Sequence, residues 1–208
     1  MAMLVSRSAA NQQLSSPDSN LLDIWAYNTY FYTMLKLTKD VSKSTKSLTK
    51  NGKSATIFSK DVVFVPINQA GNHWCMGVLN FKKGQIEYYD SLGSGEREFF
   101  FDKMKNYLKA EYDKKQQDFD FPELKPYYVE NCPQQTNTYD CGVFAMTYAE
   151  YISRSFAPFN FGQVCVKMIM CFLFFVFCFL IRVFILCISI STLHRSIWNI
   201  FVAVVYMR

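Results

Sequence analysis

The chain has 208 residues, of which 50% are hydrophobic, and it carries a net charge of +5. These averages conceal two unlike parts, because residues 164–208 hold 35 hydrophobic residues in 45, four basic residues and no acidic residue. Residues 1–163 therefore carry a net charge of only +1, which excludes a uniformly basic nucleic-acid-binding protein. The seven cysteines, four of them in the hydrophobic tail (164–208), argue against a small disulfide scaffold and favour a reducing compartment for the front part.

The first part of the chain is polar. Residues 1–20 are rich in Ser, Asn and Gln without periodicity, which predicts a disordered polar leader, and they lack the pattern of a signal peptide. Residues 21–37 carry apolar side chains at helical spacing and predict a helix. Residues 38–51 are rich in Lys, Ser and Thr and predict a solvated loop or helix face, with a basic surface for an acidic partner as the alternative.

Strand patterns follow. Residues 61–67 and 74–81 are hydrophobic runs typical of buried strands, and residues 85–89 predict a third strand. The connection Lys82-Lys83-Gly84 between the last two predicts a hairpin turn.

Two helices and a further short strand complete the front part. Residues 96–115 carry apolar side chains at positions i, i+4, i+7 and i+8, which predicts an amphipathic helix. Residues 127–130 predict a short strand, and a second helix is predicted to begin at Asp140 or Cys141 and to run through residue 152. Short strands mixed with helices predict an α+β domain between the leader and the tail.

His73 is the only histidine before the hydrophobic tail. Histidine is the side chain whose ordinary pKa lies near neutrality. Asp90 follows 17 residues later, at the end of another predicted strand. If the two strands pair as a hairpin, both side chains lie at one edge of the sheet, where the carboxylate can hold the imidazole Nδ1–H. A purely structural hydrogen bond is the alternative.

Cys141 lies at the predicted start of a helix, where the positive end of the helix dipole favours a thiolate. An adjacent imidazole can complete its activation as a nucleophile. Gln135, six residues earlier, can donate its amide to a developing oxyanion beside the Cys141 backbone N–H. Gly142 lets another chain approach closely.

The remaining cysteines of the front part, Cys75 and Cys132, are expected to be small buried hydrophobic residues. A zinc site is not expected, because the chain has no CxxC motif and only one histidine available. A thiolate nucleophile needs no metal or organic cofactor.

The motifs His73-Trp74, Asp90, Gln135 and Asp140-Cys141-Gly142 together resemble the Ulp/SENP family of SUMO-specific cysteine proteases. The stretches that carry the resemblance beside them are YNTYFYTML (27–35), IFSKDVVFVPIN (57–68) and PQQTNTYDCGVFAMTYAEYI (133–152). The resemblance covers about residues 24–163, so the family-like domain is placed at 21–163.

The resemblance implies the papain-like α+β fold of that family. It implies Cys141 as the nucleophile, His73 as the general base and Asp90 as the residue that orients it, with Gln135 in the oxyanion hole. Trp74 would cover the tunnel through which a Gly-Gly C-terminus reaches the cysteine; a plain core aromatic is the alternative. The implied substrates are SUMO precursors and SUMO-conjugated proteins, and the implied location is the nucleus or nuclear envelope.

The chain also departs from the family pattern. Residues 1–23 contain no Trp-Leu-Asn-Asp-like run, and residues 164–208 replace a polar C-terminal segment. Residues 168–190 hold a single charge, Arg182, and at 1.5 Å per residue they are long enough to cross a bilayer core of ~30 Å. Two interpretations stay open: a membrane anchor, or translated non-coding sequence at a wrongly assigned gene end.

Three functions remain in competition at this point. The first is a SUMO-directed cysteine isopeptidase, which we expect to act as a monomer. The second is a catalytically impaired SUMO-binding module, and the third is a protease for another ubiquitin-like protein such as NEDD8.

Overall fold

The structure of the chain is a computed structural model. The structure describes residues 1–13, 21–38, 57–93, 95–115, 119–155 and 158–165. The chain divides into two compact units, Met1–Gln163 and Val164–Arg208. Within the described part of the chain, no helix combines the length and the hydrophobicity needed to cross a membrane. The predicted span over 168–190 and most of the Lys-rich segment 38–51 lie outside the described residues.

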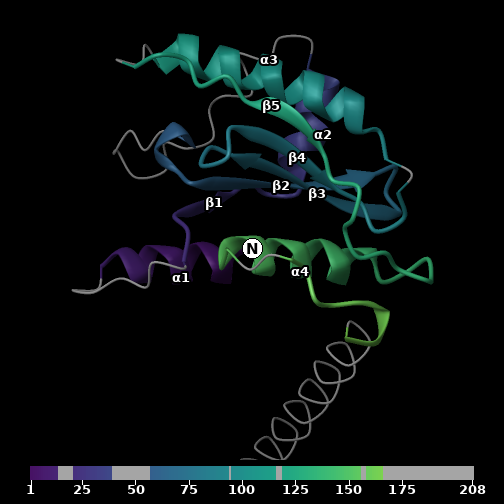
Figure 1. The fold of residues 1–208 in the computed structure, drawn as a ribbon. Coiled ribbons are helices and arrows are strands. Elements are labelled where there is room, and N and C mark those ends of the chain that lie inside the picture. Colours follow the sequence, from purple (N-terminus) through teal and green to yellow (C-terminus); the bar gives the residue numbers. More distant parts are fainter. Residues whose placement is uncertain (14–20, 39–56, 94, 116–118, 156–157, 166–208) are drawn as a thin grey trace, which may run out of the picture. The chain divides into compact units, whose positions relative to one another are not determined.

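A mixed five-stranded sheet forms the centre of the first unit, with its strands in chain order (Figure 1). The strands β2, β3 and β4 are antiparallel, whereas the outer strands β1 and β5 run parallel to their neighbours β2 and β4. The strands are β1 (Ile24–Ala26), β2 (Val62–Gln69), β3 (His73–Asn80), β4 (Gln85–Tyr89) and β5 (Lys125–Tyr128).

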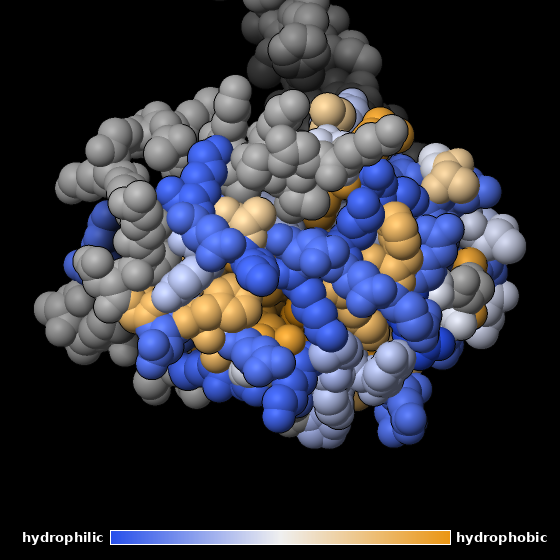
Figure 2. All heavy atoms as spheres, turned by 90° about the horizontal axis from the view of Figure 1, so that it is seen from above, coloured by the Kyte–Doolittle hydropathy of each residue, from blue (hydrophilic) through white to orange (hydrophobic). Residues whose placement is uncertain are grey.

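Helices cover both faces of this sheet (Figure 1). One face packs against α2 (Tyr30–Leu37) and α3 (Arg97–Lys115) and forms the main hydrophobic core. Gly77 of β3 is needed there, because a Cβ atom at this position would lie 2.2 Å from the Phe100 ring of α3. Figure 2 shows this face from above, where the described surface residues are mostly hydrophilic with some hydrophobic residues between them. Such a surface is expected where helices turn their polar sides to the solvent.

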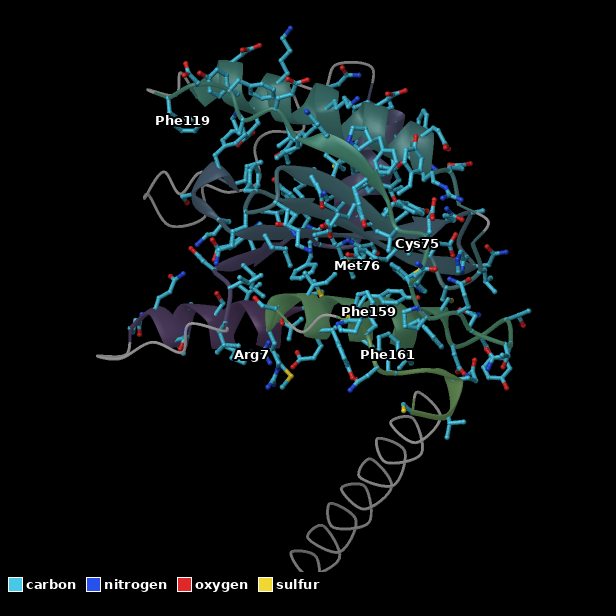
Figure 3. The ribbon with its side chains drawn as sticks, in the orientation of Figure 1. Arg7, Cys75, Met76, Phe119, Phe159 and Phe161 are labelled. Carbon is cyan, nitrogen blue, oxygen red and sulfur yellow. The ribbon has the colours of Figure 1, made fainter. Side chains whose placement is uncertain are left out.

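The other face of the sheet carries α4 (Cys141–Ser153), and α1 (Ala2–Gln12) contacts β1. Aromatic rings pack beside α4, among them Phe159 and Phe161 of the segment that follows the helix (Figure 3). Tyr148 of α4 packs against both of these rings and against Tyr89 of the sheet. This second cluster fixes α4 against the sheet, and with it Cys141 at the first helical position.

The strands and helices predicted between residues 61 and 152 are confirmed, and their boundaries shift by no more than two residues. The hairpin turn between β3 and β4 is also confirmed, since Gly84 adopts a positive φ of 66°. The hairpin register pairs Met76 with Tyr89, so the continuation of the ladder brings Cys75 beside Asp90.

The prediction of one helix over residues 21–37 is wrong in its first part. Ile24–Ala26 instead forms β1, which pairs with the distant strand β2. The helix begins only after Asn28, whose side-chain oxygen accepts the backbone N–H groups of Tyr30 and Phe31. Hydrophobic residues on both sides of this boundary imitate a single helical pattern.

The prediction that residues 1–20 form a disordered leader is wrong for α1; residues 14–20 lie outside the described part. The Arg7 guanidinium contacts Glu150 Oε1 and Ser153 Oγ of α4, each at 2.7 Å. The Ser8 hydroxyl donates to the carbonyl of Leu22. The polar residues of α1 therefore make contacts with distant segments of the chain, and a sequence pattern does not reveal such contacts.

Candidate active site

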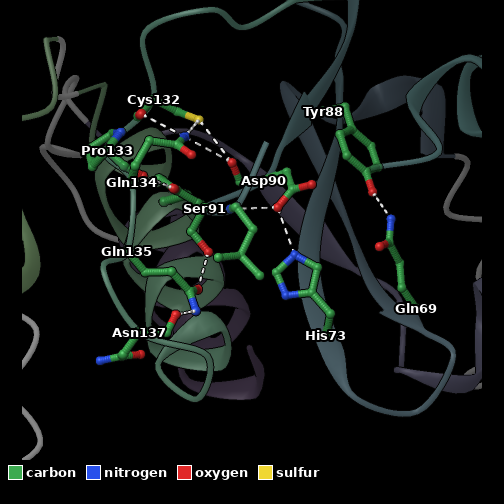
Figure 4. A network of polar contacts seen from close by, with 12 residues as sticks. Gln69, His73, Tyr88, Asp90, Ser91, Cys132, Pro133, Gln134, Gln135 and Asn137 are labelled. Atoms are coloured by element: carbon green, nitrogen blue, oxygen red, sulfur yellow. Dashed lines mark hydrogen bonds and ion pairs between the residues drawn. The ribbon is translucent and has the colours of Figure 1, made fainter. Parts of the chain in front are cut away.

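The structure brings His73 and Asp90 together at one end of the sheet (Figure 4). His73 opens β3, Asp90 directly follows β4, and His73 Nε2 lies 2.7 Å from Asp90 Oδ1. Both side chains are buried. The bond uses Nε2, so the expectation of an Nδ1 contact is wrong in this detail. Since a carboxylate only accepts, Nε2 carries the hydrogen, and Nδ1 is left with a lone pair that can take a proton.

Asp90 is held in turn by its own neighbours. The Leu92 N–H donates to Oδ1 at 2.9 Å, and Oδ2 is buried without a hydrogen-bond partner among the residues that the structure describes. The backbone carbonyl of Asp90 accepts the Gln134 Nε2–H at 3.0 Å. The orientation of the imidazole therefore depends on a carboxylate that is fixed at several points.

Cys141 is buried and occupies the first position of α4. The carbonyl of the preceding Asp140 accepts the N–H groups of Val143 and Phe144, which starts the helix. Within the described part of the chain, no hydrogen bond uses the N–H of Cys141 or joins its Sγ to His73. The helix start thus leaves the Cys141 N–H without a partner among the described residues, next to the thiol of the same residue.

Gln135 lies between the end of β4 and the start of α4 (Figure 4). Its side-chain oxygen accepts the Ser91 hydroxyl at 2.6 Å, and its Nε2 donates to the carbonyl of Asn137. The predicted residue is therefore fixed close to the helix that begins with Cys141. Sequence reasoning missed Ser91, whose only sequence signal is its place directly after Asp90.

Trp74 lies against the first turn of α4. A Cβ atom at Gly142 would lie 3.6 Å from Trp74 Cδ1, an ordinary van der Waals distance. The half-buried indole helps to line a small apolar cavity of about 260 Å³ together with Met76, Gly142 and Ala145. A methyl group at position 142 would therefore touch the indole without a clash.

Cys75 is a buried core residue, as predicted, but it also lies beside the candidate site. One ligand atom each from His73, Cys75 and Asp90 lie within 4.8 Å of one another, the sole group of this kind among the described residues. Burial raises the pKa of the Cys75 thiol well above its usual range, so this sulfur stays protonated. His73 Nε2 and Asp90 Oδ1 already bond each other, and we assign no metal there.

Cys132 is also buried, and its sulfur takes part in the polar network. Its Sγ lies 3.5 Å from the Asp90 carbonyl and 3.3 Å from Gln134 Nε2. These contacts attach the segment before α4 to the end of β4. Cys132 thus stabilises the same loop that carries Gln135.

The comparison with known protein families decides which family this arrangement represents. The family model of the Ulp1 protease family, C-terminal catalytic domain, matches residues 1–172. The chain belongs to the Ulp1 protease family. The matched span is wider than the expected residues 24–163 and includes α1.

Relatives and solved structures agree with this family. The chain is 36% identical over 145 residues to a sentrin-specific protease of Caenorhabditis elegans, covering 69% of this chain and 20% of the relative. It is 33% identical over 140 residues to ubiquitin-like-specific protease 1 of Saccharomyces cerevisiae, covering 65% and 21%. The chain thus spans about a fifth of the length of these curated relatives.

Solved structures of Ulp1 share the fold. A SUMO protease Ulp1 with its catalytic cysteine oxidised to a sulfenic acid matches with a TM-score of 0.58 and 25% identity, over 76% of this chain and 66% of that chain. The C-terminal Ulp1 protease domain in complex with SMT3, the yeast ortholog of SUMO, matches with a TM-score of 0.54 and 27% identity, over 76% and 67%. The predicted α+β fold of the Ulp type is confirmed.

Proposed function

We propose that this protein is a SUMO-specific cysteine protease that hydrolyses the peptide or isopeptide bond after the Gly-Gly C-terminus of SUMO. The observation that carries the proposal is the His73–Asp90 pair, which faces the segment leading to Cys141 at the helix start. The names of the relatives support SUMO as the partner, because one related Ulp1 domain is complexed with the yeast ortholog of SUMO.

In the proposed first step, His73 is the base. His73 Nδ1 takes the proton of the Cys141 thiol, and the thiolate attacks the carbonyl carbon of the last glycine. The imidazolium formed is stabilised by the buried Asp90 carboxylate 2.7 Å from its Nε2. The helix start adds a favourable dipole for the thiolate.

The tetrahedral intermediate carries its negative charge on the former carbonyl oxygen. The backbone N–H of Cys141 and the Nε2–H of Gln135 are the donors for this oxyanion. The imidazolium then gives its proton to the leaving amine, which is a lysine Nζ in a SUMO conjugate. A water molecule, deprotonated by His73, hydrolyses the thioester and releases the SUMO carboxylate.

We propose that Trp74 selects the two C-terminal glycines of the substrate. The support is its place beside Gly142 at the start of α4, where both residues line an apolar cavity of about 260 Å³. A substrate backbone without side chains would pass beside the indole most easily.

The test is a reaction of the full chain with SUMO whose C-terminus carries a vinyl sulfone. The proposal expects a covalent adduct on Cys141, located by mass spectrometry, and no adduct with Cys141→Ser. A wild-type chain that stays unlabelled while a known SUMO protease reacts would contradict the proposal. SUMO binding without an adduct would indicate the impaired binding module, and preferential labelling by a NEDD8 vinyl sulfone would indicate the other substrate.

We extend the proposal to a monomeric enzyme located at the nucleus or nuclear envelope. Membrane association through residues 168–190 stays a prediction outside the described residues. Labelling residues 1–163 beside the full chain would measure what the tail contributes to activity.

A further inference from the structure

Ser91 binds Gln135 through two hydrogen bonds. Its hydroxyl lies 2.6 Å from Gln135 Oε1, and its carbonyl accepts the backbone N–H of Gln135 at 2.9 Å. The side chain of Ser91 is only 1% exposed, so water does not compete for these bonds. Two residues 44 positions apart in the sequence are thereby held in one fixed arrangement (Figure 4).

The second partner of the Gln135 amide determines which way the amide points. Its Nε2 donates to the carbonyl of Asn137, and a carbonyl oxygen can only accept. The NH₂ group therefore faces Asn137 and Oε1 faces Ser91, whose hydroxyl must donate. One N–H of the amide is used by Asn137, and no other acceptor of Nε2 is found in the described part of the chain.

The free N–H of this amide lies close to the start of α4. Asn137 belongs to the turn that precedes the helix, since its side-chain oxygen accepts the N–H groups of Tyr139 and Asp140. Cys141 follows at once. The amide of Gln135 is thus fixed at its oxygen by Ser91 and at one hydrogen by Asn137, and its other hydrogen has no acceptor among the described residues.

We infer that Ser91 is a positioning residue for the oxyanion donor, and this inference rests on the proposed protease function. The Ser91 hydroxyl fixes Oε1 so that the free Nε2–H of Gln135 is directed at the oxyanion. Without the hydroxyl the amide can rotate, and a flipped amide would present its oxygen to a negative charge. Preorganised donors are effective because they need no reorientation during the reaction.

An effect of Ser91 on its neighbour Asp90 must be separated from an effect on Gln135. We would compare wild type, Ser91→Ala, Gln135→Ala and the double variant in the full chain, using SUMO with a C-terminal fluorogenic coumarin amide. Ser91→Ala is expected to lower kcat about tenfold with KM within about twofold, the size of one lost hydrogen bond. Gln135→Ala is expected to lower kcat about 100-fold, and the double variant should be no slower than Gln135→Ala.

Alkylation of Cys141 by iodoacetamide measures the reactivity of the thiolate in a reaction that forms no oxyanion. This displacement needs the thiolate and the orienting His73–Asp90 pair, but no carbonyl oxygen becomes charged. We expect Ser91→Ala to be alkylated at the wild-type rate, measured at Cys141 by mass spectrometry. A parallel loss of alkylation and hydrolysis would mean that Ser91 acts through Asp90, and the inference would be overturned.

Two further variants keep the test decisive. Ser91→Thr keeps the hydroxyl and is expected to restore most of kcat, whereas equal losses in the Thr and Ala variants would overturn the inference. Ser153→Ala removes another buried serine hydroxyl, remote from the site, and serves as the matched control for stability. An inactive wild type would refute the proposed function and the inference together, while an active wild type with an unchanged Ser91→Ala variant would refute the inference alone.

Discussion

Asp90→Asn removes one buried negative charge and changes almost no shape. Asp90 Oδ1 accepts His73 Nε2–H at 2.7 Å and the Leu92 N–H at 2.9 Å. In the variant an amide oxygen at this position accepts from both donors, whereas an amide nitrogen would face the Leu92 N–H. The imidazole therefore keeps its tautomer, and the variant loses only the charge that stabilises the imidazolium.

The size of the effect follows from Coulomb's law. With about 4 Å between the centres of the two delocalised charges and an effective dielectric constant of about 20, the attraction is about 4 kcal/mol. Since about 1.4 kcal/mol corresponds to a factor of ten in rate, complete loss of this attraction lowers kcat/KM by about 10³. The bond is buried, so salt screens it little.

The assay is hydrolysis of the SUMO coumarin amide, with melting curves to show that the variant is folded. Glu87→Gln is the matched control, because Glu87 is a buried carboxylate of β4, three residues before Asp90, and accepts hydrogen bonds from Asn80 and Tyr89. A rate for Asp90→Asn within about fivefold of wild type would refute the reasoning. An equal loss for Glu87→Gln would show that burial of charge in β4, and not the contact with His73, is responsible.

Two further predictions concern stability. Gly77→Ala would place a Cβ atom 2.2 Å from the Phe100 ring, so we expect a loss of at least about 1–3 kcal/mol in urea unfolding. The pKa of Glu150, although raised by burial, is held below its ordinary value by hydrogen bonds from Arg7 and Arg154. A carboxylate whose pKa is lowered by folding stabilises the folded protein at pH values above its unfolded-state pKa of about 4.3, and this contribution is lost as the pH falls. Glu150→Gln should therefore be less stable at pH 7 by under about 1 kcal/mol, given its partial exposure. The difference should shrink as the pH falls below about 4.3, and a difference that stays constant would contradict this assignment.

Local patterns predicted the part of the fold that depends on neighbouring residues. The β3–β4 hairpin follows from two hydrophobic runs and a Lys-Lys-Gly turn, and it alone brings His73 and Asp90 to one edge of the sheet. The start of α4 follows from its helical pattern, which places Cys141 at a helix N-terminus. The two placements that the sequence predicts correctly, the His73–Asp90 contact and Cys141 at a helix start, both depend on such local patterns.

Contacts between distant segments were not predictable in this way. The strand β1 exists because it pairs with β2, and α1 is fixed by Arg7, whose partner Glu150 lies 143 positions away. The contact of Ser91 with Gln135 belongs to the same class, because a serine after a strand is usual in turns and carries no signal for its partner. The sequence does not predict the partners of such polar side chains, because the fold determines which distant residues lie beside them.

The end of β4 supports two separate parts of the proposed chemistry with consecutive residues. Both residues directly follow β4, and the Asp90 side chain binds His73 whereas the Ser91 side chain binds Gln135. Asp90→Asn should therefore lower both alkylation and hydrolysis, because the thiolate itself is less stabilised. Ser91→Ala should lower hydrolysis alone. Both substitutions could instead lower the alkylation and hydrolysis rates in the same proportion. In that case Asp90 and Ser91 would act as one structural unit, and the assignment of Asp90 to the base and of Ser91 to the oxyanion donor would be wrong.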